Sequence, residues 1–378
     1  MSTLRVIVDD VIAPGSAGIG RYAEELTRQL IATAPRGSSV AGVVSASPEP
    51  DYLDLRERLP GLEDLYKSPL ARRELTAAWL HGFTRLPGSG MTHATSLLAP
   101  LHRHDRHANP GAQTVVTIHD AIAWTHPELL PPRTASWARG MAKRAERYAD
   151  AVVVPTHAVA DELLEHLSFD GRVRVIGGAP SSTLHPVSDA AARRDAHGIP
   201  DQYLLTIGGS EPRKGLDPLV RSLADKGTHG IPLFIAGAPV EFEDELRAVA
   251  RDAGVKADRI RVLGQVSSED LAAILGGATI FVQPSLEEGF GLSMLEAFGF
   301  GLPVVHSDSP ALVEVAAGAG VAVPRDGEAY AARLGEAIAE LLGDDARRKS
   351  LGVNAQDRSR AFSWRDSAEK VWQLHADL

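Results

Sequence analysis

The chain has 378 residues, which is more than a single hydrophobic core usually supports, so we expect two domains. Apolar residues make up 44% of it, yet no apolar run approaches the roughly 18 residues that a membrane-spanning helix needs. The net charge of −10 and the lack of a basic stripe disfavour binding to nucleic acid. Without cysteine, the chain can form no disulfide, thiolate nucleophile or cysteine-ligated metal site.

The first residues lead directly into a strand pattern, so we expect no signal peptide and a cytoplasmic protein. Residues 1–188 contain 19 basic and 20 acidic residues, against 20 and 29 in the remainder, so most of the negative charge lies in the second part. Residues 70–86 and 133–148 have helical patterns rich in arginine. They are either solvated helix faces or sites of peripheral contact with the inner face of a membrane, and the sequence leaves both open. Trp79 and Phe83 are more typical of a core.

Short apolar runs that read as buried strands alternate with amphipathic helical patterns along the whole chain. In chain order the predicted strands are residues 5–8, 40–44, 114–118, 151–154, 173–176, 203–207, 233–236, 260–263, 279–282 and 303–305. Strands that alternate with helices are typical of parallel sheets covered by helices on both faces, which predicts an α/β protein.

The alternating pattern is interrupted at about residues 179–200, where Pro, Ser and Gly gather. We interpret this segment as a linker and predict Rossmann-like domains at 1–180 and 181–361. An amphipathic run over 362–378, with Ser363 as its N-cap, predicts a terminal helix. Two Rossmann-like domains that face each other across a cleft would hold ligands beyond the carboxyl ends of their strands, and every motif described below follows a predicted strand.

The most informative motif follows the predicted strand at 279–282. It reads Glu288-Gly289-Phe290-Gly291-Leu292-Ser293-Met294-Leu295-Glu296 and leads into a helical pattern that ends at Gly301. A strand, a loop and a helix in this order aim backbone N–H groups and the positive end of the helix dipole at a phosphate. Eight residues of helix rise about 12 Å, so the two carboxylates would meet opposite ends of an elongated ligand, such as a sugar and a ribose flanking a diphosphate. Two glutamates on a solvated helix face are the alternative.

Two further loops of the second half follow predicted strands. The first brings glycine, which lets a ligand approach the backbone, together with adjacent cations that suit a leaving diphosphate. The second precedes a helix for which Ser268 is the expected N-cap. The residues singled out in these loops are Gly209, Arg213 and Lys214 in the first, and Gly264, Gln265 and Val266 in the second.

In the first half, Gly18 and Gly20 lie in a predicted glycine-rich loop, where backbone N–H groups would reach a phosphate. This segment lacks the Gly-x-Gly-x-x-Gly fingerprint of dinucleotide-binding proteins, which disfavours a dehydrogenase. His119 and Asp120 end the predicted strand at 114–118. A single histidine is more often structural, but the position at a strand end favours a functional His119, whereas Asp120 is expected to cap the following turn.

The motif from Glu288 to Glu296, followed by Gly301-Leu302-Pro303-Val304-Val305, resembles the signature of the retaining glycosyltransferases of glycosyltransferase family 4. The resemblance extends through nearly the whole chain. It implies the GT-B fold, in which two Rossmann-like domains face each other across a cleft and a C-terminal helix crosses back to the first domain. It also implies that the first domain binds the acceptor and the second the nucleotide-sugar donor.

The resemblance further implies roles for individual residues. Glu288 would contact the donor sugar, and Glu296 would bind the ribose hydroxyls. Lys214 matches a lysine that contacts the donor phosphates, and Arg213 is expected to share this contact because Gly209 stands where many members have arginine. The other implied donor contacts are the backbone of Gly264, Gln265 and Val266 at the nucleobase, and Ser285, Gly289, Phe290, Gly291 and Leu292 around the nucleotide. From the first domain, Gly18, Gly20 and His119 would face the diphosphate, the acceptor and the donor sugar.

We therefore expect a retaining transfer of a hexose from a nucleotide diphosphate sugar to a hydroxyl of a glycan, a lipid-linked sugar or a small molecule. The expected catalytic residues are His119, Arg213, Lys214 and Glu288. GDP-mannose is the first expectation for the donor, with UDP-, dTDP- and ADP-sugars open, and no other cofactor is expected. No Asp-x-Asp motif follows a strand of the second half, so we expect no metal site. A sugar-nucleotide epimerase of the same architecture and a non-catalytic sugar-nucleotide-binding protein are the alternatives.

Overall fold

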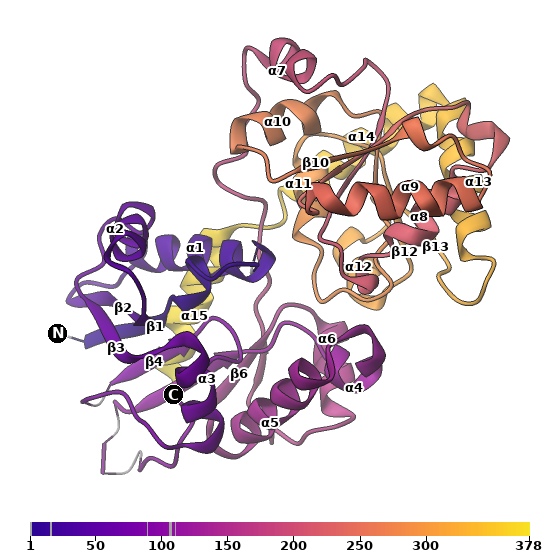
Figure 1. Ribbon diagram of the computed structural model, residues 1–378. Helices are drawn as coiled ribbons and strands as arrows, with labels where there is room; N and C mark the ends of the chain where they lie inside the picture. Colours follow the sequence, from indigo (N-terminus) through magenta and orange to yellow (C-terminus); the bar gives the residue numbers. More distant parts are fainter. Residues whose placement is uncertain (1, 16, 89, 106–107, 110) are drawn as a thin grey trace. The chain divides into compact units, whose positions relative to one another are not determined.

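A computed structural model describes residues 2–15, 17–88, 90–105, 108–109 and 111–378 of the chain, which form two compact units (Figure 1). The first unit comprises Met1–Gly178 and Ser363–Leu378, and the second comprises Ala179–Phe362. Each unit is a parallel sheet with helices packed against it, so the predicted α/β class with two Rossmann-like domains is confirmed. None of the helices formed by the described residues has both the length and the apolarity that a membrane span requires.

In the described residues of the first unit, seven parallel strands form a sheet of order β3-β2-β1-β4-β5-β6-β7. The strands are β1 Ser2–Ile7, β2 Ser38–Ala46, β3 Leu65–Ala71, β4 Met91–Ala94, β5 Gln113–Thr117, β6 Ala151–Val154 and β7 Val173–Val175. The helices are α1 Ala17–Ala32, α2 Glu49–Arg58, α3 Arg72–His81, α4 Ile122–Thr125, α5 Pro132–Tyr148, α6 His157–Leu164 and α15 Trp364–Asp377, with 3-10 turns η1 Asp9–Val11 and η2 Pro127–Leu129.

The carboxyl ends of the central strands of this sheet lie in register. Ile7 of β1 aligns with Val43 of β2 and with Ala94 of β4, and Ala94 aligns with Val116 of β5. All four side chains are buried in one hydrophobic cluster. Because parallel strands end at the same edge, the residues that follow β1, β4 and β5 are brought together there.

The sequence pattern does not predict β3 and β4, and it predicts too long a helix at 70–86. β3 is the edge strand, and it contains Lys67 and Pro69, which obscure the apolar pattern but are tolerated where one side of the strand has no partner. α3 ends after His81, because Gly82 adopts a left-handed conformation that stops the helix. Trp79 is buried as expected, but Phe83 lies beyond the helix and is 82% exposed, so its assignment to the core is wrong.

The C-terminal helix α15 crosses back to the first unit, as the resemblance implies (Figure 1). Ser363 is its N-cap, as predicted, and accepts a hydrogen bond from Asp366 N. The buried indole of Trp372 donates from Nε1 to Leu30 O of α1 at 3.1 Å, and Ser367 Oγ donates to Gly177 O at 2.8 Å. The last segment of the chain is therefore a built-in part of the first unit.

The second unit, residues 179–362, is described throughout and contains a parallel sheet of six strands in the order β10-β9-β8-β11-β12-β13. The strands are β8 Leu204–Ile207, β9 Leu233–Ala236, β10 Ile260–Gly264, β11 Ile280–Gln283, β12 Val304–Ser307 and β13 Val321–Val323. The helices are α7 Ala190–Ala196, α8 Leu216–Ser222, α9 Glu243–Asp252, α10 Ser268–Gly277, α11 Leu292–Gly299, α12 Pro310–Ala316, α13 Tyr330–Gly343 and α14 Asp345–Ser359. The 3-10 turns are η3 Pro212–Lys214, η4 Lys226–Thr228, η5 Val240–Phe242 and η6 Ala257–Arg259.

The segment 179–200 is not a free linker, because α7 lies within it and packs on α10. Arg194 of α7 donates from Nη1 to Ala273 O at 3.1 Å. The prediction of Ser268 as the N-cap of α10 is also wrong, since Ser267 accepts the hydrogen bond from Asp270 N. Serine is a favoured N-cap residue, so the sequence does not distinguish Ser267 from Ser268. Only the backbone conformation decides which of the two caps the helix.

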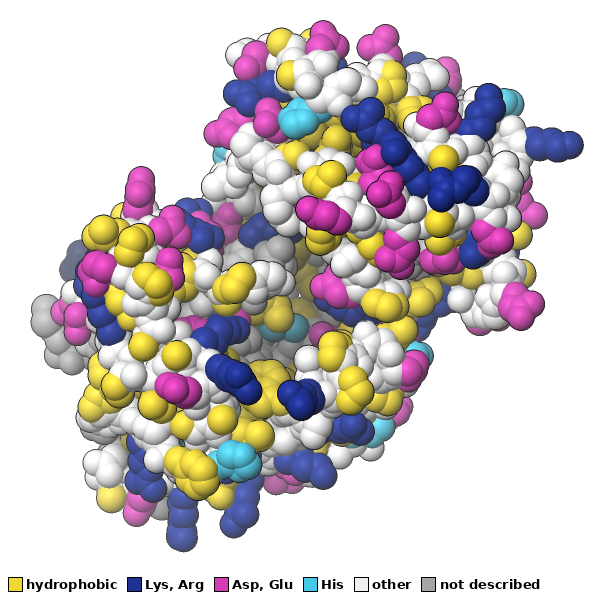
Figure 2. All heavy atoms as spheres, in the orientation of Figure 1, with side chains coloured by type: hydrophobic (Ala, Val, Ile, Leu, Met, Phe, Trp, Pro, Cys, Tyr) yellow, Lys and Arg dark blue, Asp and Glu magenta, His cyan; other side chains and the backbone are white. Residues whose placement is uncertain are grey.

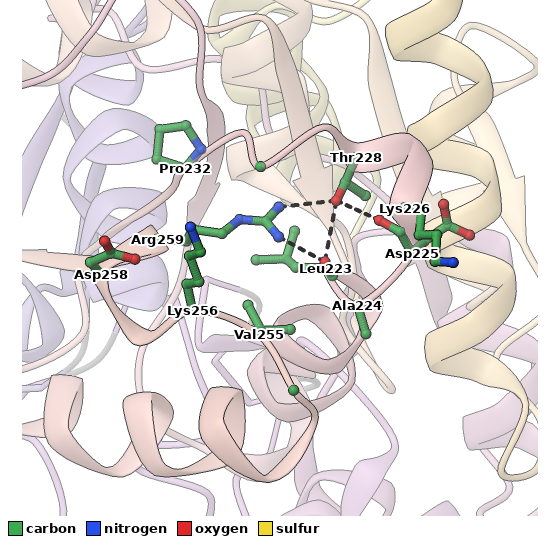
Figure 3. A pocket seen from close by; sticks show the side chains of 12 residues that line it. Leu223, Ala224, Asp225, Lys226, Thr228, Pro232, Val255, Lys256, Asp258 and Arg259 are labelled. Carbon is green, nitrogen blue, oxygen red and sulfur yellow. Dashed lines mark hydrogen bonds between the residues drawn. The ribbon is translucent and has the colours of Figure 1, made fainter.

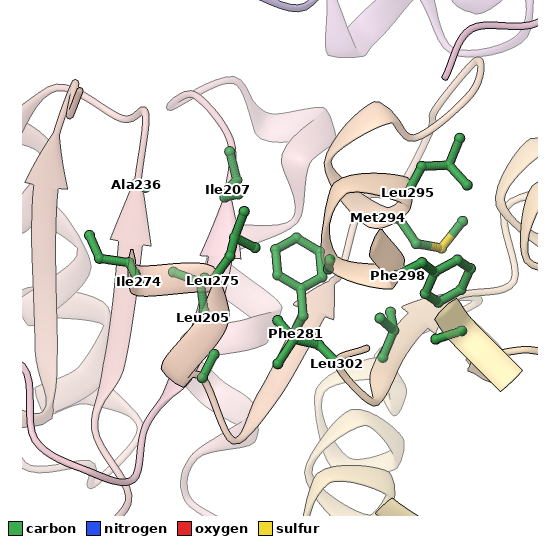
Figure 4. Close-up of a cluster of buried hydrophobic side chains, with 14 of the residues drawn as sticks. Leu205, Ile207, Ala236, Ile274, Leu275, Phe281, Met294, Leu295, Phe298 and Leu302 are labelled. Carbon is green, nitrogen blue, oxygen red and sulfur yellow. The ribbon is translucent and has the colours of Figure 1, made fainter. Parts of the chain in front are cut away.

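The sheet of the second unit is covered on both faces by hydrophobic side chains. Along β11, Ile280 and Val282 belong to one hydrophobic cluster, and Phe281 belongs to the cluster on the opposite face. Figure 4 shows part of the second of these clusters, to which Met294 and Phe298 of α11 belong together with Phe281. Strands that are buried on both faces lack an alternating pattern, which explains the continuous apolar runs in the sequence. The same packing fixes α11, and with it the loop that joins α11 to β11.

Candidate active site

The loop between β11 and α11 carries Glu288, whereas Glu296 lies inside α11. The assumption of eight helical residues between them is therefore wrong, because only the part from Leu292 to Glu296 is helical and rises about 6 Å. Glu296 is only 2% exposed, which excludes the alternative of a solvated helix face. A buried carboxylate is costly unless it is paired or hydrogen-bonded, so the burial of Glu296 indicates a position with a specific role, whereas the Glu288 side chain is 14% exposed.

Glu288 is held by side chains from two neighbouring loops. Lys214 Nζ donates to Glu288 Oε2 at 2.8 Å, and Arg213 Nη1 lies 3.9 Å from Glu288 Oε1. Ser285 Oγ also donates to Glu288 Oε2 at 3.2 Å, while it accepts from Gln283 Nε2. Burial by itself would raise the pKa of Glu288, but the charges of Lys214 and Arg213 and these hydrogen bonds outweigh it and lower that pKa. Glu288 is thus held as a carboxylate next to two cations.

The backbone ties the loops after β8 and β11 together. Leu286 N donates to Arg213 O at 2.7 Å, so the segment with Arg213 and Lys214 cannot move independently of the segment with Glu288. Gly215, which directly follows Lys214, has φ +67°, and a Cβ there would overlap Pro284 O. The close approach of the two loops therefore requires glycine at this position.

The amino end of α11 begins at a left-handed glycine. Gly291 has φ +89° at the N-cap, and a Cβ there would lie 2.5 Å from Leu312 Cδ2. The first intrahelical bond is donated by Met294 N to Gly291 O at 3.0 Å, so the N–H groups of Leu292 and Ser293 precede the hydrogen-bonded ladder. These N–H groups and the helix dipole suit a phosphate.

The remaining residues predicted for the second unit lie along the same sheet edge. Gly209 follows β8, and Gly264, Gln265 and Val266 end or follow β10. Gln265 Nε2 donates to Gly237 O at 3.0 Å, and Gly237 N donates to Gly264 O at 2.8 Å, so the loops after β9 and β10 are bound to each other. Since the strand order is β10-β9-β8-β11, a long ligand lying across these strand ends would meet Val266, Lys214 and Glu288 in that order.

Phe290 and Gly289 occupy the middle of the loop and are buried. The ring of Phe290 meets the ring of Phe362 edge to face, with centroids 5.8 Å apart. Phe362 in turn stacks against the guanidinium of Arg358, 4.7 Å from the ring centroid. The side chain of Phe290 therefore packs within the second unit and supports the loop.

In the first unit, His119 follows β5 and is turned inward. Its Nε2 donates to Thr95 O at 2.8 Å, which leaves Nδ1 as the acceptor nitrogen of the neutral ring. Burial lowers the pKa of His119, although the bond to Thr95 and the charges of Asp120 and Asp10 act in the opposite direction. Asp120 caps the turn as predicted, because Asp120 Oδ1 accepts from Ile122 N at 3.2 Å.

Gly18 and Gly20 do not lie in a loop as predicted, because α1 already begins at Ala17. Both are in the first turn of this helix, but only Gly18 lies before the hydrogen-bonded ladder, so the N–H of Gly18 and not that of Gly20 is available to an anion. The sequence pattern misplaces the start of the helix because two glycines in its first turn read as a loop.

A charged cluster beside His119 was not expected from the sequence. Asp9 and Asp10 follow β1 and are buried, and both form ion pairs with Arg72, with 2.6 Å between Arg72 Nη2 and Asp10 Oδ1. Ser96 Oγ donates to Asp10 Oδ2 at 2.6 Å. The guanidinium of Arg72 is therefore held by two buried carboxylates, although its side chain is 37% exposed. Two acidic residues directly after a strand were the signal for this cluster.

A cavity of about 530 Å³ lies in the second unit, but at the opposite edge of its sheet (Figure 3). Its lining residues precede β9 and β10, at the amino ends of these strands. Arg259 bridges its wall, donating to Leu223 O at 2.8 Å and to Thr228 Oγ1 at 3.0 Å. These hydrogen bonds connect the segment before β10 to the segment before β9. None of the residues that line the cavity is among those predicted to bind the donor. Among the described residues, no group of three or more His, Asp or Glu side chains could hold a metal ion.

Two family models match the chain, one for each unit. The model described as Glycosyltransferase Family 4 matches residues 16–179, and the model described as Glycosyl transferases group 1 matches residues 189–358. Together the two matches span most of the chain.

Known proteins with similar sequences are glycosyltransferases. The O-antigen chain mannosyltransferase B of Escherichia coli is 28% identical over 376 residues, which is 92% of this chain and 92% of that protein. A D-inositol 3-phosphate glycosyltransferase of Corynebacterium glutamicum (strain R) is 30% identical over 242 residues, which is 61% of this chain and 57% of that protein.

Solved structures with the same fold include Anabaena Alr3699/HepE in complex with UDP-glucose, with a TM-score of 0.73 and 18% identity over the whole of both chains. WaaG, a glycosyltransferase involved in lipopolysaccharide biosynthesis, has a TM-score of 0.70 and 18% identity over 98% of each chain. The two parallel sheets and the motif around Glu288 are consistent with the glycosyltransferase family that the two family models indicate. The chain therefore belongs to glycosyltransferase family 4 and is a glycosyltransferase with the GT-B fold.

Proposed function

We propose that the enzyme transfers mannose from GDP-mannose to a hydroxyl of a glycan or lipid-linked sugar, with retention and without a metal ion. The observation that carries this proposal is the pair of Lys214 and Glu288 beside the amino end of α11, a site suited to a sugar diphosphate. The choice of mannose is supported by the O-antigen chain mannosyltransferase B and by the serotype-specific mannosyltransferase WbdA of Escherichia coli, which is 28% identical over 269 residues.

The proposed reaction requires stabilisation of charge on the leaving diphosphate. Lys214, Arg213 and the N–H groups of Leu292 and Ser293 would bind this diphosphate, and preformed donors of this kind need no reorganisation during the reaction. Because two cations already neutralise the leaving group, the proposal assigns no role to a metal ion. Glu288 would bind a hydroxyl of the donor sugar, and Glu296 would bind the ribose.

Without a covalent glycosyl-enzyme intermediate, retention requires that the acceptor attacks from the side on which the diphosphate leaves. The acceptor oxygen forms a bond to the anomeric carbon, the bond from this carbon to the diphosphate oxygen breaks, and the acceptor proton passes to the leaving diphosphate. No separate base is then needed. The neutral His119 would accept a hydrogen bond at Nδ1 from a sugar hydroxyl, because its Nε2 proton is already bound to Thr95 O.

We also propose that the acceptor is a glycan chain. This choice is supported by the similarity to the O-antigen chain mannosyltransferase B. Peripheral contact of the first unit with an anionic membrane is proposed as well, supported by the exposed Phe83 and by the cations of α5. Figure 2 shows several Lys and Arg side chains over this unit on the visible face. Cosedimentation with vesicles of anionic lipid, compared with neutral vesicles and with Phe83→Ala, tests this contact. Equal recovery in all three would reject it.

The donor is tested first by the thermal unfolding midpoint with GDP, UDP, dTDP and ADP, because a ligand bound by the folded state raises this midpoint. We expect the largest shift with GDP. Turnover of GDP-mannose with an oligomannose acceptor, followed by NMR of the new anomeric centre, then tests retention, and addition of EDTA tests metal independence. A larger shift with another nucleotide would overturn the choice of GDP. An inverted anomeric centre would overturn retention, and complete loss of activity with EDTA would overturn metal independence. Epimerised sugar nucleotide without transfer would overturn the reaction itself.

A further inference from the structure

Two adjacent glutamates of the β11–α11 loop are directed to opposite sides. Glu288 faces the loop after β8 through Lys214. Glu287 is 5% exposed at its side chain and faces the loop after β13, where Arg325 Nη2 donates to Glu287 Oε1 at 2.7 Å. The two carboxylates are chemically equivalent and adjacent in the chain, so something in the fold must decide which of them meets Lys214.

Arg325 is itself held firmly. Arg325 N and Arg325 Nη1 both donate to Asp308 Oδ1, at 3.0 and 3.2 Å, and Asp308 N donates to Val323 O at 2.9 Å. These bonds tie together the segments that follow β12 and β13. Because β11, β12 and β13 are neighbours in the sheet, the guanidinium reaches the β11–α11 loop from a rigid base.

Two more hydrogen bonds fix the same side of the loop. Ser307 Oγ donates to Ser285 O at 2.5 Å, and the buried Tyr330 hydroxyl donates to Pro284 O at 3.0 Å. The loop is thus bound on one side to β12 and α13 and on the other to the Arg213–Lys214 segment. On the side of β12 and α13, the loop is also held by an ion pair. Arg325 pairs there with Glu287, which directly precedes Glu288 in the chain.

We propose that Arg325 is a positioning residue for sugar transfer, which holds Glu287 on the β13 side of the loop and so leaves Glu288 against Lys214. The proposal rests on the proposed function in that Glu288 is taken to face the donor sugar. Removal of Arg325 leaves a buried carboxylate without its guanidinium, and the loop then gains by turning Glu287 towards Lys214 and Arg213. Glu287 then takes the place of Glu288 next to Lys214, and Glu288 is moved away from it.

The test compares Arg325→Met, the double variant Glu287→Gln/Arg325→Met, Arg325→Lys and a control. The matched control is Arg193→Met, since Arg193 is similarly exposed, lies in the same unit and pairs with Asp189 and Asp270. Since a misplaced contact of about 1 Å costs about 100-fold, we expect Arg325→Met to lower kcat by about 10- to 100-fold, with the donor KM changed less than about 3-fold. The double variant removes both charges and should regain kcat to within about 3-fold of the original enzyme. Arg325→Lys should lie between.

A second readout needs no substrate. Hydrogen exchange of the peptide 284–292 should be faster in Arg325→Met than in Arg193→Met and should return to the original rate in the double variant. Unchanged kcat and exchange in Arg325→Met would overturn the proposal, and so would a double variant that stays as slow as the single one. If the original enzyme turns over no sugar nucleotide, the proposed function fails, whereas the exchange experiment still decides the role of Arg325.

Discussion

Lys214 makes the shortest polar contact of Glu288 and is the cation best placed for the diphosphate of a sugar nucleotide. In the unliganded site its charge is balanced by Glu288, and Arg213 stands 3.9 Å from the same carboxylate. A bound diphosphate would share these cations with Glu288. The affinity of the site for a diphosphate therefore depends on two cations, whose charge is compensated only in part by one carboxylate.

We predict that Lys214→Ala weakens the binding of GDP by about 10- to 100-fold, because a hydrogen bond to a charged group contributes about 1.5–3 kcal/mol. Glu288 would then also face the ligand with one cation fewer. Isothermal titration calorimetry measures the affinity. Lys256→Ala is the control, since Lys256 lines the cavity at the other edge of the same sheet and should leave the affinity unchanged. Equal affinity of Lys214→Ala and the original enzyme would remove Lys214 from the phosphate site.

At the residue scale, the sequence identifies Glu288, Lys214 and His119 as special because each follows a predicted strand. It does not reveal their partners. Arg325 is 38 residues from Glu287, and Arg72 is 62 residues from Asp10, and nothing in the local pattern connects them. Such pairs form only when the strand order of a sheet brings the loops to one edge, since β11 and β13, like β1 and β3, are separated by one strand.

At the level of elements, the turn between η3 and α8 is constrained by its close approach to the backbone of Pro284. Gly215 ends η3 in the left-handed conformation and lies directly against the backbone of Pro284. Any side chain there would push the Lys214 segment away from the β11–α11 loop. The geometry of the two loops is thus fixed by backbone contact as well as by ion pairs.

We predict that Gly215→Ala lowers the free energy of unfolding of the second unit by more than the about 1–2 kcal/mol that a left-handed alanine costs, and that it also reduces GDP affinity. The matched control is Gly254→Ala, since Gly254 has nearly the same φ of +71° but no atom within 4 Å of an added Cβ. Urea unfolding followed by far-UV circular dichroism gives the stability. Equal losses in the two variants would mean that the contact with Pro284 does not constrain the loops.

Elements were predictable from the sequence where burial is uniform. The central strands β8, β9 and β11 are apolar along their whole length and were recognised, as was α15 with its N-cap. β3 was not, because an edge strand tolerates polar residues and proline, and β13 was not, because it has only three residues. α1 was placed too late because its first turn contains two glycines.

On the scale of the whole molecule, the C-terminal helix joins the end of the chain to its first unit through a buried polar contact. His375 of α15 contacts Gln113 Oε1 through Nδ1 at 3.0 Å, and its ring lies 5.8 Å from that of His93 in β4. Neither nitrogen of His93 has a hydrogen-bond partner among the described residues. Burial lowers the pKa of His93 to about 3, with a further contribution from His375, and burial lowers the pKa of His375 to about 4 although Asp150 acts in the opposite direction.

We predict that the stability of the first unit decreases as the pH falls below about 6.5. Both histidines stay neutral in the folded unit, whereas the unfolded chain takes up protons near its usual pKa of 6.5. Their contribution is complete above that pH and is lost at about 1.4 kcal/mol per pH unit for each histidine, down to the folded pKa values. Urea unfolding followed by tryptophan fluorescence measures this unit selectively, since all five tryptophans belong to it. His93→Leu should reduce the slope by about one proton, and an unchanged slope would contradict the prediction.

The sequence by itself determined the α/β class, the two Rossmann-like units, the family and the strand-end positions of Glu288, Lys214 and His119. These properties follow from local pattern, because apolar runs, glycine turns and a contiguous motif are encoded by neighbouring residues. Only the tertiary structure decided that Glu287 and Glu288 point to opposite sides, that Arg72 is bound by two buried aspartates, and that α15 packs against α1. The physical reason is that long-range ion pairs and packing depend on which strands are neighbours in a sheet, and this order is not contained in any short stretch of the chain.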